Sequence, residues 1–186
     1  MTAHRVLVVD DEPQIQRFLK PSLGAAGYEV IAAVNGSQAL KAAATQAPDI
    51  ILLDLGLPDM DGKDVIAELR TWSKVPIVVL SARDREAEKI AALDLGADDY
   101  VNKPFGIGEL MARLRTALRH ATQSAGQVAQ VVSGDLVIDI AAHSVTRSGT
   151  PIKLTPKEFE LLAILARNAE RVVTHRQILT SVWGPA

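Results

Sequence analysis

The chain has 186 residues, of which 48% are hydrophobic and 23% charged, and its formal net charge is −2 at pH 7. This composition is typical of a globular protein with one ordinary domain and room for part of a second. The weak net charge gives no indication of nucleic-acid binding, and the absence of cysteine excludes disulfides and thiolate metal sites.

The chain gives no indication of a membrane or secretory protein. Its longest apolar runs, at 50–53 and 77–80, are far too short to span a bilayer. The start "MTAHRVLVVDDE" places carboxylates where a secretory signal needs an apolar stretch. We therefore expect a cytoplasmic protein that does not associate with membranes.

The first 120 residues alternate between short apolar runs and amphipathic stretches. The apolar runs predict five strands, at residues 5–9, 28–33, 49–53, 76–80 and 100–101. Helical periodicity lies between them, as at 37–47 and 64–72. Because strands one, three and four are apolar throughout, we predict an α/β fold with a five-stranded, doubly wound parallel sheet covered on both faces. Pro21 is expected to kink or shorten the first helix.

The pattern changes after residue 120. The small, polar segment 121–130 predicts a linker. Three short strands separated by turn residues follow, at 136–140, 143–147 and 150–154. Two helices come next, and each begins with a capping box, formed by Thr155 with Glu158 and by Thr174 with Gln177. A small sheet followed by two short capped helices indicates a helix-turn-helix within residues 131–186.

Polar side chains stand where the predicted parallel strands end. Asp10 and Asp11 follow strand one, Asp54 follows strand three, Ser81 ends strand four, and Lys103 follows strand five. Because these strand ends share one edge of the sheet, the side chains are expected to meet there. Clustered carboxylates suit a hard divalent cation, Mg²⁺ above all. Asp54 would then be a nucleophile toward phosphorus, with the lysine and serine sharing the charge of the transferred group.

Each of these residues alone has an ordinary structural explanation. Single acids at strand ends are common as helix caps and turn residues, and a lone Lys103 would be a solvated loop lysine. Burying Asp10, Asp11 and Asp54 together without a cation, however, would cost several kcal/mol. The combination therefore indicates a phosphoryl site, although no single member does.

The motifs "VVDDE", "LLDLGLPDMDG", "LSA" and "GADDYVNKPF" closely resemble the receiver domain of bacterial two-component response regulators, over residues 4–120. The resemblance implies a flavodoxin-like receiver domain at 1–120. In it, Asp54 accepts a phosphoryl group from a sensor histidine kinase. Mg²⁺ would be held by Asp10, Asp11, Asp54 and the backbone carbonyl of Gly56.

The same resemblance assigns roles around the phosphoryl group. Ser81 and Tyr100 would form the switch pair, in which Tyr100 turns inward when Ser81 moves toward the phosphoryl oxygens. Lys103 would contact those oxygens directly. The Lys103–Pro104 peptide bond would be cis.

Residues 131–186 resemble the amino-terminal part of the winged-helix domain of the OmpR/PhoB class, without its recognition helix and wing. Within that class, the motifs are most similar to regulators of a potassium-transport operon. The resemblance implies that the full-length parent binds promoter DNA. Because the recognition helix reads the major groove, we expect weak or no DNA binding by these 186 residues.

This class forms homodimers on phosphorylation, through the fourth helix, fifth strand and fifth helix of the receiver. The matching residues combine charged side chains with an apolar patch. They are Lys89, Ile90, Leu93, Asp98, Asp99, Glu109, Ala112, Arg113 and Arg119.

Two other functions remain open. The chain could be a stand-alone receiver that acts as a phosphate sink, with an inert C-terminal region. A less favoured alternative is a phosphatase with an aspartate nucleophile. Such enzymes carry an Asp-x-Asp arrangement on the first strand, whereas Asp10 and Asp11 are adjacent and Asp54 is on the third. We therefore expect a phosphorylated regulator rather than an enzyme.

Overall fold

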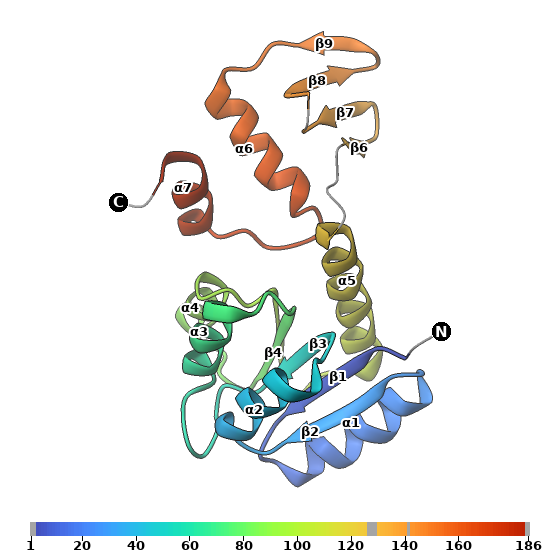
Figure 1. Ribbon diagram of the computed structural model, residues 1–186, viewed down its shortest axis with the longest axis vertical. Helices are drawn as coiled ribbons and strands as arrows, with labels where there is room; N and C mark the ends of the chain where they lie inside the picture. The colour runs from blue at the N-terminus through green and yellow to red at the C-terminus, as the bar shows by residue number, and fades with distance from the viewer. Residues whose placement is uncertain (1–2, 126–129, 141, 185–186) are drawn as a thin grey trace. The chain divides into compact units, whose positions relative to one another are not determined.

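The computed structural model describes residues 3–125, 130–140 and 142–184 (Figure 1). The chain forms two compact units, Met1–Arg119 and His120–Ala186. Within the described ranges, no helix is long and apolar enough to cross a membrane.

Strands and helices alternate along the first unit. The strands are β1 (Arg5–Val9), β2 (Glu29–Ala33), β3 (Ile50–Leu53), β4 (Ile77–Ser81) and β5 (Asp99–Asn102). The helices are α1 (Pro13–Ala25), α2 (Gly36–Gln46), α3 (Gly62–Trp72), α4 (Glu86–Asp94) and α5 (Ile107–Ala125). All strand pairs are parallel, in the order β2-β1-β3-β4-β5. The predicted doubly wound parallel sheet is confirmed.

Two apolar layers cover the faces of this sheet. Val6 and Val8 of β1 pack with buried side chains of α1 and α5. Leu7 and Val9 point the other way and pack with α2, α3 and α4. Successive side chains of a strand alternate between faces, so a strand buried on both faces must be apolar at every position. The carboxyl ends of the strands are thereby held in a rigid frame.

Pro21 does not shorten α1, which continues to Ala25. Leu19 and Leu23, on either side of the proline, are both completely buried. Each buried leucine contributes about 1.5–3 kcal/mol, whereas a proline inside a helix costs about 3 kcal/mol. Packing against the sheet therefore outweighs the local cost, and the predicted shortening is wrong.

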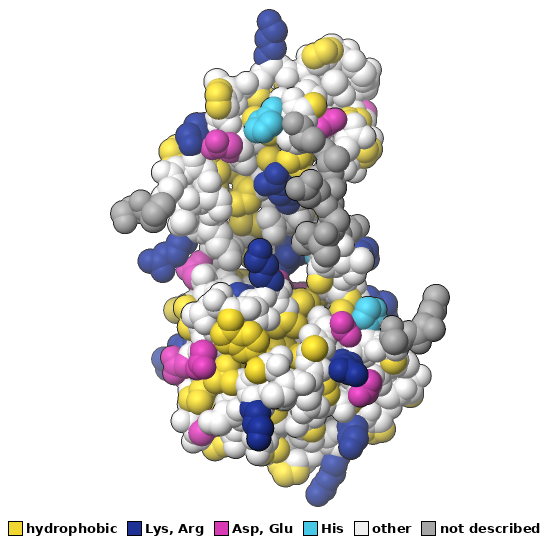
Figure 2. Space-filling view, in the orientation of Figure 1, with side chains coloured by type: hydrophobic (Ala, Val, Ile, Leu, Met, Phe, Trp, Pro, Cys, Tyr) yellow, Lys and Arg dark blue, Asp and Glu magenta, His cyan; other side chains and the backbone are white. Residues whose placement is uncertain are grey.

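Several large apolar side chains of the first unit remain exposed. Figure 2 shows a face of this unit on which hydrophobic side chains gather among charged ones. The exposed residues include Phe18, Val34, Trp72, Ile90 and Leu95. Exposed apolar residues are normal singly, and only a contiguous patch indicates an interaction surface.

The second unit has a four-stranded antiparallel sheet followed by two helices. The strands, in spatial and chain order, are β6 (Gln130–Ser133), β7 (Leu136–Asp139), β8 (Ser144–Arg147) and β9 (Thr150–Ile152). The helices are α6 (Pro156–Arg167) and α7 (His175–Trp183), and both predicted capping boxes are confirmed. Phe159 and Ala163 of α6 pack on Ile138 and Val145 of the sheet, and these residues form the core of the second unit.

The segment predicted as a linker, 121–130, has structure at both ends. Helix α5 continues to Ala125, and Gln130 opens β6, a strand that the sequence pattern did not predict. Residues 126–129 lie outside the described part of the chain. Extending an existing helix costs far less than nucleating one, so small polar residues can remain helical at the end of α5.

Candidate functional site

Several strand ends of the first unit meet at one edge of the parallel sheet. Asp10 follows β1 and Asp54 follows β3, and the backbone N–H of Asp54 donates to the carbonyl of Val9 (2.9 Å). Ser81 is the last residue of β4, and its carbonyl accepts from the N–H of Lys103, just beyond β5 (3.0 Å). The parallel register thus brings these four polar residues to the same edge.

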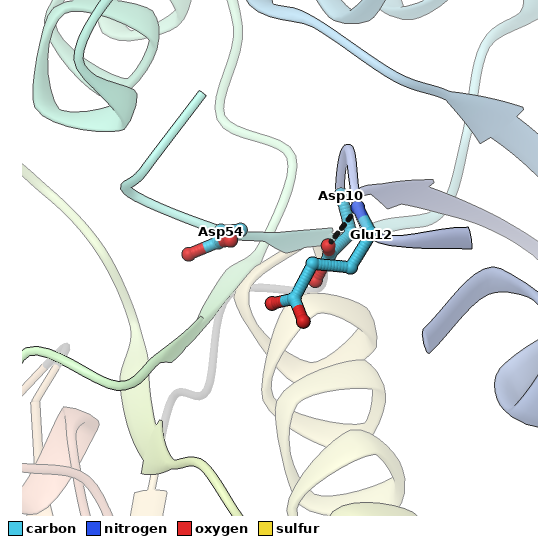
Figure 3. A group of neighbouring side chains, drawn as sticks. All are labelled: Asp10, Glu12 and Asp54. Atoms are coloured by element: carbon cyan, nitrogen blue, oxygen red, sulfur yellow. Dashed lines mark hydrogen bonds between the residues drawn. The ribbon is translucent and has the colours of Figure 1, made fainter. Parts of the chain in front are cut away.

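Three carboxylates cluster there (Figure 3). Oxygens of Asp10, Glu12 and Asp54 lie within 4.8 Å of one another. Asp10 and Asp54 are buried, whereas Glu12 is exposed. The N–H of Glu12 donates to Asp10 Oδ1 (2.9 Å), which fixes the orientation of that carboxylate. Asp11 is exposed and does not belong to the cluster.

Lys103 supplies the cation that the cluster needs. Its Nζ donates to Asp10 Oδ2 (2.7 Å), Glu12 Oε1 (2.9 Å) and Asp54 Oδ2 (3.1 Å). The lysine side chain is only 10% exposed. The Lys103–Pro104 peptide bond is cis, as predicted.

The charges of this cluster are strongly coupled. Burial raises the pKa of Asp10, and the hydrogen bonds from Lys103 and from the Glu12 N–H offset only part of that effect. Burial lowers the pKa of Lys103, but its hydrogen bonds to Asp10 and Glu12 and the charge of Asp54 outweigh burial, so the net shift is upward. The lysine therefore stays protonated. The formal charges of the three carboxylates and the ammonium sum to −2 (−3 + 1), which favours binding of a further cation.

The segment after Asp54 is closely packed. The N–H of Gly56 donates to Asp54 Oδ1 (3.2 Å). A Cβ on Gly62, the first residue of α3, would lie 2.6 Å from the carbonyl oxygen of Asp54 and 2.6 Å from Cα of Leu55. Only glycine allows α3 to begin this close to the backbone of Asp54 and Leu55. The loop thus contacts both the side chain of Asp54, through the Gly56 N–H, and its main chain, through Gly62.

The two predicted switch residues contact the backbone of the same residue, Arg83. Ser81 is buried, and its Oγ accepts from the Arg83 N–H (3.1 Å). The hydroxyl of Tyr100 donates to the Arg83 carbonyl (2.7 Å). The ring of Tyr100 packs against the core, and Lys89 Nζ lies 5.6 Å from its centroid.

The residues predicted for a dimer face differ in accessibility. Asp98 accepts from Arg70 Nη2 (3.2 Å) and from the Ile77 N–H (2.8 Å), and Leu93 is buried in the core. These two are therefore engaged within the chain. Ile90 is 45% exposed, and the other apolar candidate, Ala112, is exposed too.

The charged candidates of α5 form pairs within the chain. Arg113 Nη1 contacts both carboxylate oxygens of Asp99 (3.0 and 2.9 Å). Its Nη2 contacts Glu109 Oε1 (3.2 Å). Arg119 is exposed, and Lys89 Nζ lies 3.5 Å from Asp84 Oδ1. These side chains remain partly accessible on the surface of the first unit.

Sequence reasoning did not predict Glu12 as a member of the acidic cluster, nor the ion pairs of Arg83. Glu12 carried a weak signal, because it follows Asp10 by two residues. The partners of Arg83, Asp61 and Glu88, lie 22 and five residues away. No sequence spacing indicates that these side chains pair with Arg83.

Comparison with known families agrees with this geometry. Residues 6–115 match the response regulator receiver domain, and residues 149–186 match the C-terminal domain of transcriptional regulatory proteins. The first match covers more than half of the chain. The protein therefore belongs to the response regulators, with a receiver domain joined to a DNA-binding domain of the OmpR/PhoB type.

Among individual proteins, the chain is similar to regulators called KdpE. It is 52% identical over 180 residues to the KDP operon transcriptional regulatory protein KdpE of Escherichia coli strain K12, covering 97% of this chain and 80% of that protein. It is 50% identical over 182 residues to KdpE of Mycobacterium tuberculosis strain H37Rv, with coverage of 97% and 80%. The crystal structure of DrrB, an OmpR/PhoB homologue from Thermotoga maritima, aligns with a TM-score of 0.59 at 29% identity, covering 99% of this chain and 82% of DrrB.

Proposed function

We propose that this protein is a KdpE-like regulator that accepts a phosphoryl group on Asp54 from a sensor histidine kinase. The observation that carries the proposal is the surroundings of Asp54, a buried carboxylate whose Oδ2 lies 3.1 Å from the Lys103 ammonium. The similarity to KdpE proteins supports control of a potassium-transport operon as the output. The receiver and DNA-binding domains support a kinase and promoter DNA as partners.

The acceptor chemistry needs little from the protein beyond positioning. A carboxylate oxygen of Asp54 attacks phosphorus, the bond from phosphorus to the donor nitrogen breaks, and the leaving nitrogen keeps the electron pair. No proton has to be removed from an ionised carboxylate. The Lys103 ammonium is placed to neutralise a phosphoryl oxygen. Ser81 Oγ accepts from the Arg83 N–H and so keeps its own proton to donate.

A magnesium site is proposed at the acidic cluster, with Asp10, Asp11, Asp54 and the carbonyl of Gly56 as ligands. An all-oxygen donor set with excess negative charge fits this hard cation, which would neutralise charge on the transferred group. The position of Glu12 makes it a competitor for the role of Asp11. Mg²⁺ titration of Asp11→Asn and Glu12→Gln separates the two, because substitution of the residue that binds the ion lowers the Mg²⁺ affinity more.

The dimer face is proposed at α4, β5 and α5. Its support is the exposed Ile90 of α4, together with charged side chains of both signs on these elements that are paired within one chain. A twofold interface doubles each new pair around a shared apolar patch. Sedimentation of phosphorylated protein before and after Ile90→Glu tests this surface, since a buried charge at its centre opposes association.

The central experiment is incubation with acetyl phosphate and Mg²⁺, followed by intact-mass measurement. We expect one phosphoryl adduct per chain in the wild type and none in Asp54→Asn. Pro13→Ala, at the exposed first residue of α1, serves as the control substitution. Sustained turnover of small phosphate esters would indicate a phosphatase, and a wild type without an adduct would refute phosphorylation at Asp54.

A further inference from the structure

Arg83 connects the switch residues to two helices. It lies in the loop between β4 and α4, two residues after Ser81. Its backbone N–H donates to the Ser81 hydroxyl (3.1 Å), and its carbonyl accepts from the Tyr100 hydroxyl (2.7 Å). One peptide segment therefore contacts both residues of the proposed switch.

The side chain of Arg83 leaves this loop in the direction of α3 and α4. Its Nη1 lies 2.8 Å from Asp61 Oδ2 and 3.1 Å from Glu88 Oε2. Asp61 caps the N-terminus of α3, where its Oδ1 accepts from the Lys63 N–H (2.9 Å). Glu88 lies in the first turn of α4. One guanidinium thus joins the starts of two helices.

Lys63 also belongs to this set of ion pairs. Its Nζ lies 3.0 Å from the same Glu88 oxygen that contacts Arg83. We call Asp61, Lys63, Arg83 and Glu88 the helix-start cluster. Its side chains are between 24% and 38% exposed, so water screens them only in part.

The charges of the cluster support one another. Hydrogen bonding to Asp61 and Glu88 raises the pKa of Arg83, despite partial burial. Hydrogen bonds from Lys63 and Arg83 lower the pKa of Glu88. Burial raises the pKa of Asp61, but the Lys63 N–H and the Arg83 guanidinium outweigh it, so the net shift is downward. These pKa shifts favour the ionised forms of Asp61, Arg83 and Glu88.

We propose that Arg83 is a positioning residue for the phosphorylation switch. Its ion pairs with Asp61 and Glu88 couple its own backbone, which Ser81 and Tyr100 both contact, to the position of α4. This inference rests on the proposed phosphorylation of Asp54. A move of Ser81 toward a phosphoryl group displaces the Arg83 backbone, and the anchored side chain transmits that displacement to α4. Without the side chain, Asp54 still accepts a phosphoryl group, but Tyr100 and α4 no longer respond together.

The chain offers a direct spectroscopic test. It contains two tyrosines, Tyr28 and Tyr100, so 3-fluorotyrosine labelling gives two ¹⁹F resonances, assigned with Tyr28→Phe. Spectra of the whole chain are recorded with Mg²⁺, before and after acetyl phosphate, alongside intact mass. In Arg83→Ala we expect an unchanged adduct, an unchanged Tyr28 signal, and a Tyr100 signal shifted toward that of free fluorotyrosine.

Dimerisation provides the second measurement. Partly exposed ion pairs each change an equilibrium about threefold, so loss of both pairs weakens phosphorylation-linked dimerisation about tenfold. Asp61→Asn and Glu88→Gln each remove one charge with little change of shape, and Asn retains the cap of α3. Asp61→Asn is expected to produce about a threefold effect, and Glu88→Gln at least that, because it also loses the pair with Lys63. Arg83→Lys should recover part of the loss because lysine retains the charge but not the planar fork.

Arg85→Ala is the matched control. Arg85 lies in the same loop and is exposed, with no ion pair to it among the described residues. If Arg83→Ala and Arg85→Ala give the same Tyr100 signal and the same dimerisation constant while both carry the adduct, the coupling role of Arg83 is refuted. A wild type without an adduct would instead refute the proposed phosphorylation, which separates the two failures.

Discussion

Removal of the lysine charge is the sharpest test of the acidic cluster. In Lys103→Met, Asp10 and Asp54 lose the ammonium that lies 2.7 and 3.1 Å from their oxygens. The aspartate side chains are 1% and 9% exposed, so water cannot replace the missing partner well. Breaking a buried ion pair by removing one member costs about 3–5 kcal/mol.

We expect the cost of losing the Lys103 ammonium to lie at the lower end of this range of about 3–5 kcal/mol. The third carboxylate, Glu12, is 55% exposed and can turn into solvent, which relieves part of the repulsion. We therefore expect Lys103→Met to lose about 3 kcal/mol of unfolding free energy at pH 7 in the presence of EDTA. Mg²⁺ at 100 times its Kd should stabilise the variant by about 2.7 kcal/mol.

Urea denaturation with and without Mg²⁺ measures both effects. Lys74→Met is the matched control, because Lys74 is exposed and its loss should change stability by less than about 0.5 kcal/mol. A loss below about 1 kcal/mol in Lys103→Met under EDTA would show that the ammonium does not compensate the buried carboxylates, and the charge argument for the site would fail.

Two further predictions concern the same edge of the sheet. Burial raises the pKa of Asp10 above 3.8; the folded protein therefore holds this proton to a higher pH, and Mg²⁺ affinity measured by calorimetry should fall as pH drops through that raised pKa. Affinity independent of pH down to 3.8 would contradict this. Gly62→Ala should lose roughly 1–3 kcal/mol in urea denaturation, because the added methyl meets backbone atoms at 2.6 Å. Gly108→Ala, with nothing within 4 Å, is its control, and equal stabilities would refute the packing argument.

The sequence alone determined the framework of the first unit and the polar residues that meet at one edge of its sheet. Apolar runs must become strands buried on both faces, and the register of a parallel sheet then brings Asp54 and Lys103 to the same edge. The capping boxes also predicted the starts of α6 and α7. The two residues of each box are only three positions apart, so their pairing can be read from the sequence. These features depend on short-range patterns or on a topology that the patterns define.

Other features depended on tertiary packing. The pattern could not show that Glu12 rather than Asp11 joins the acidic cluster, because the loop after β1 does not keep the alternation of a strand. Pro21 was tolerated because burial of neighbouring leucines exceeds its local cost.

The same limit applies to charged side chains far apart in the chain. The sequence did not show that Asp98, predicted at a dimer face, pairs within the chain with Arg70, 28 residues away. Arg83 meets Asp61 across 22 residues. A charge has no preferred sequence spacing for its partner, so only the folded arrangement of β3, β4 and the starts of α3 and α4 decided which charges meet.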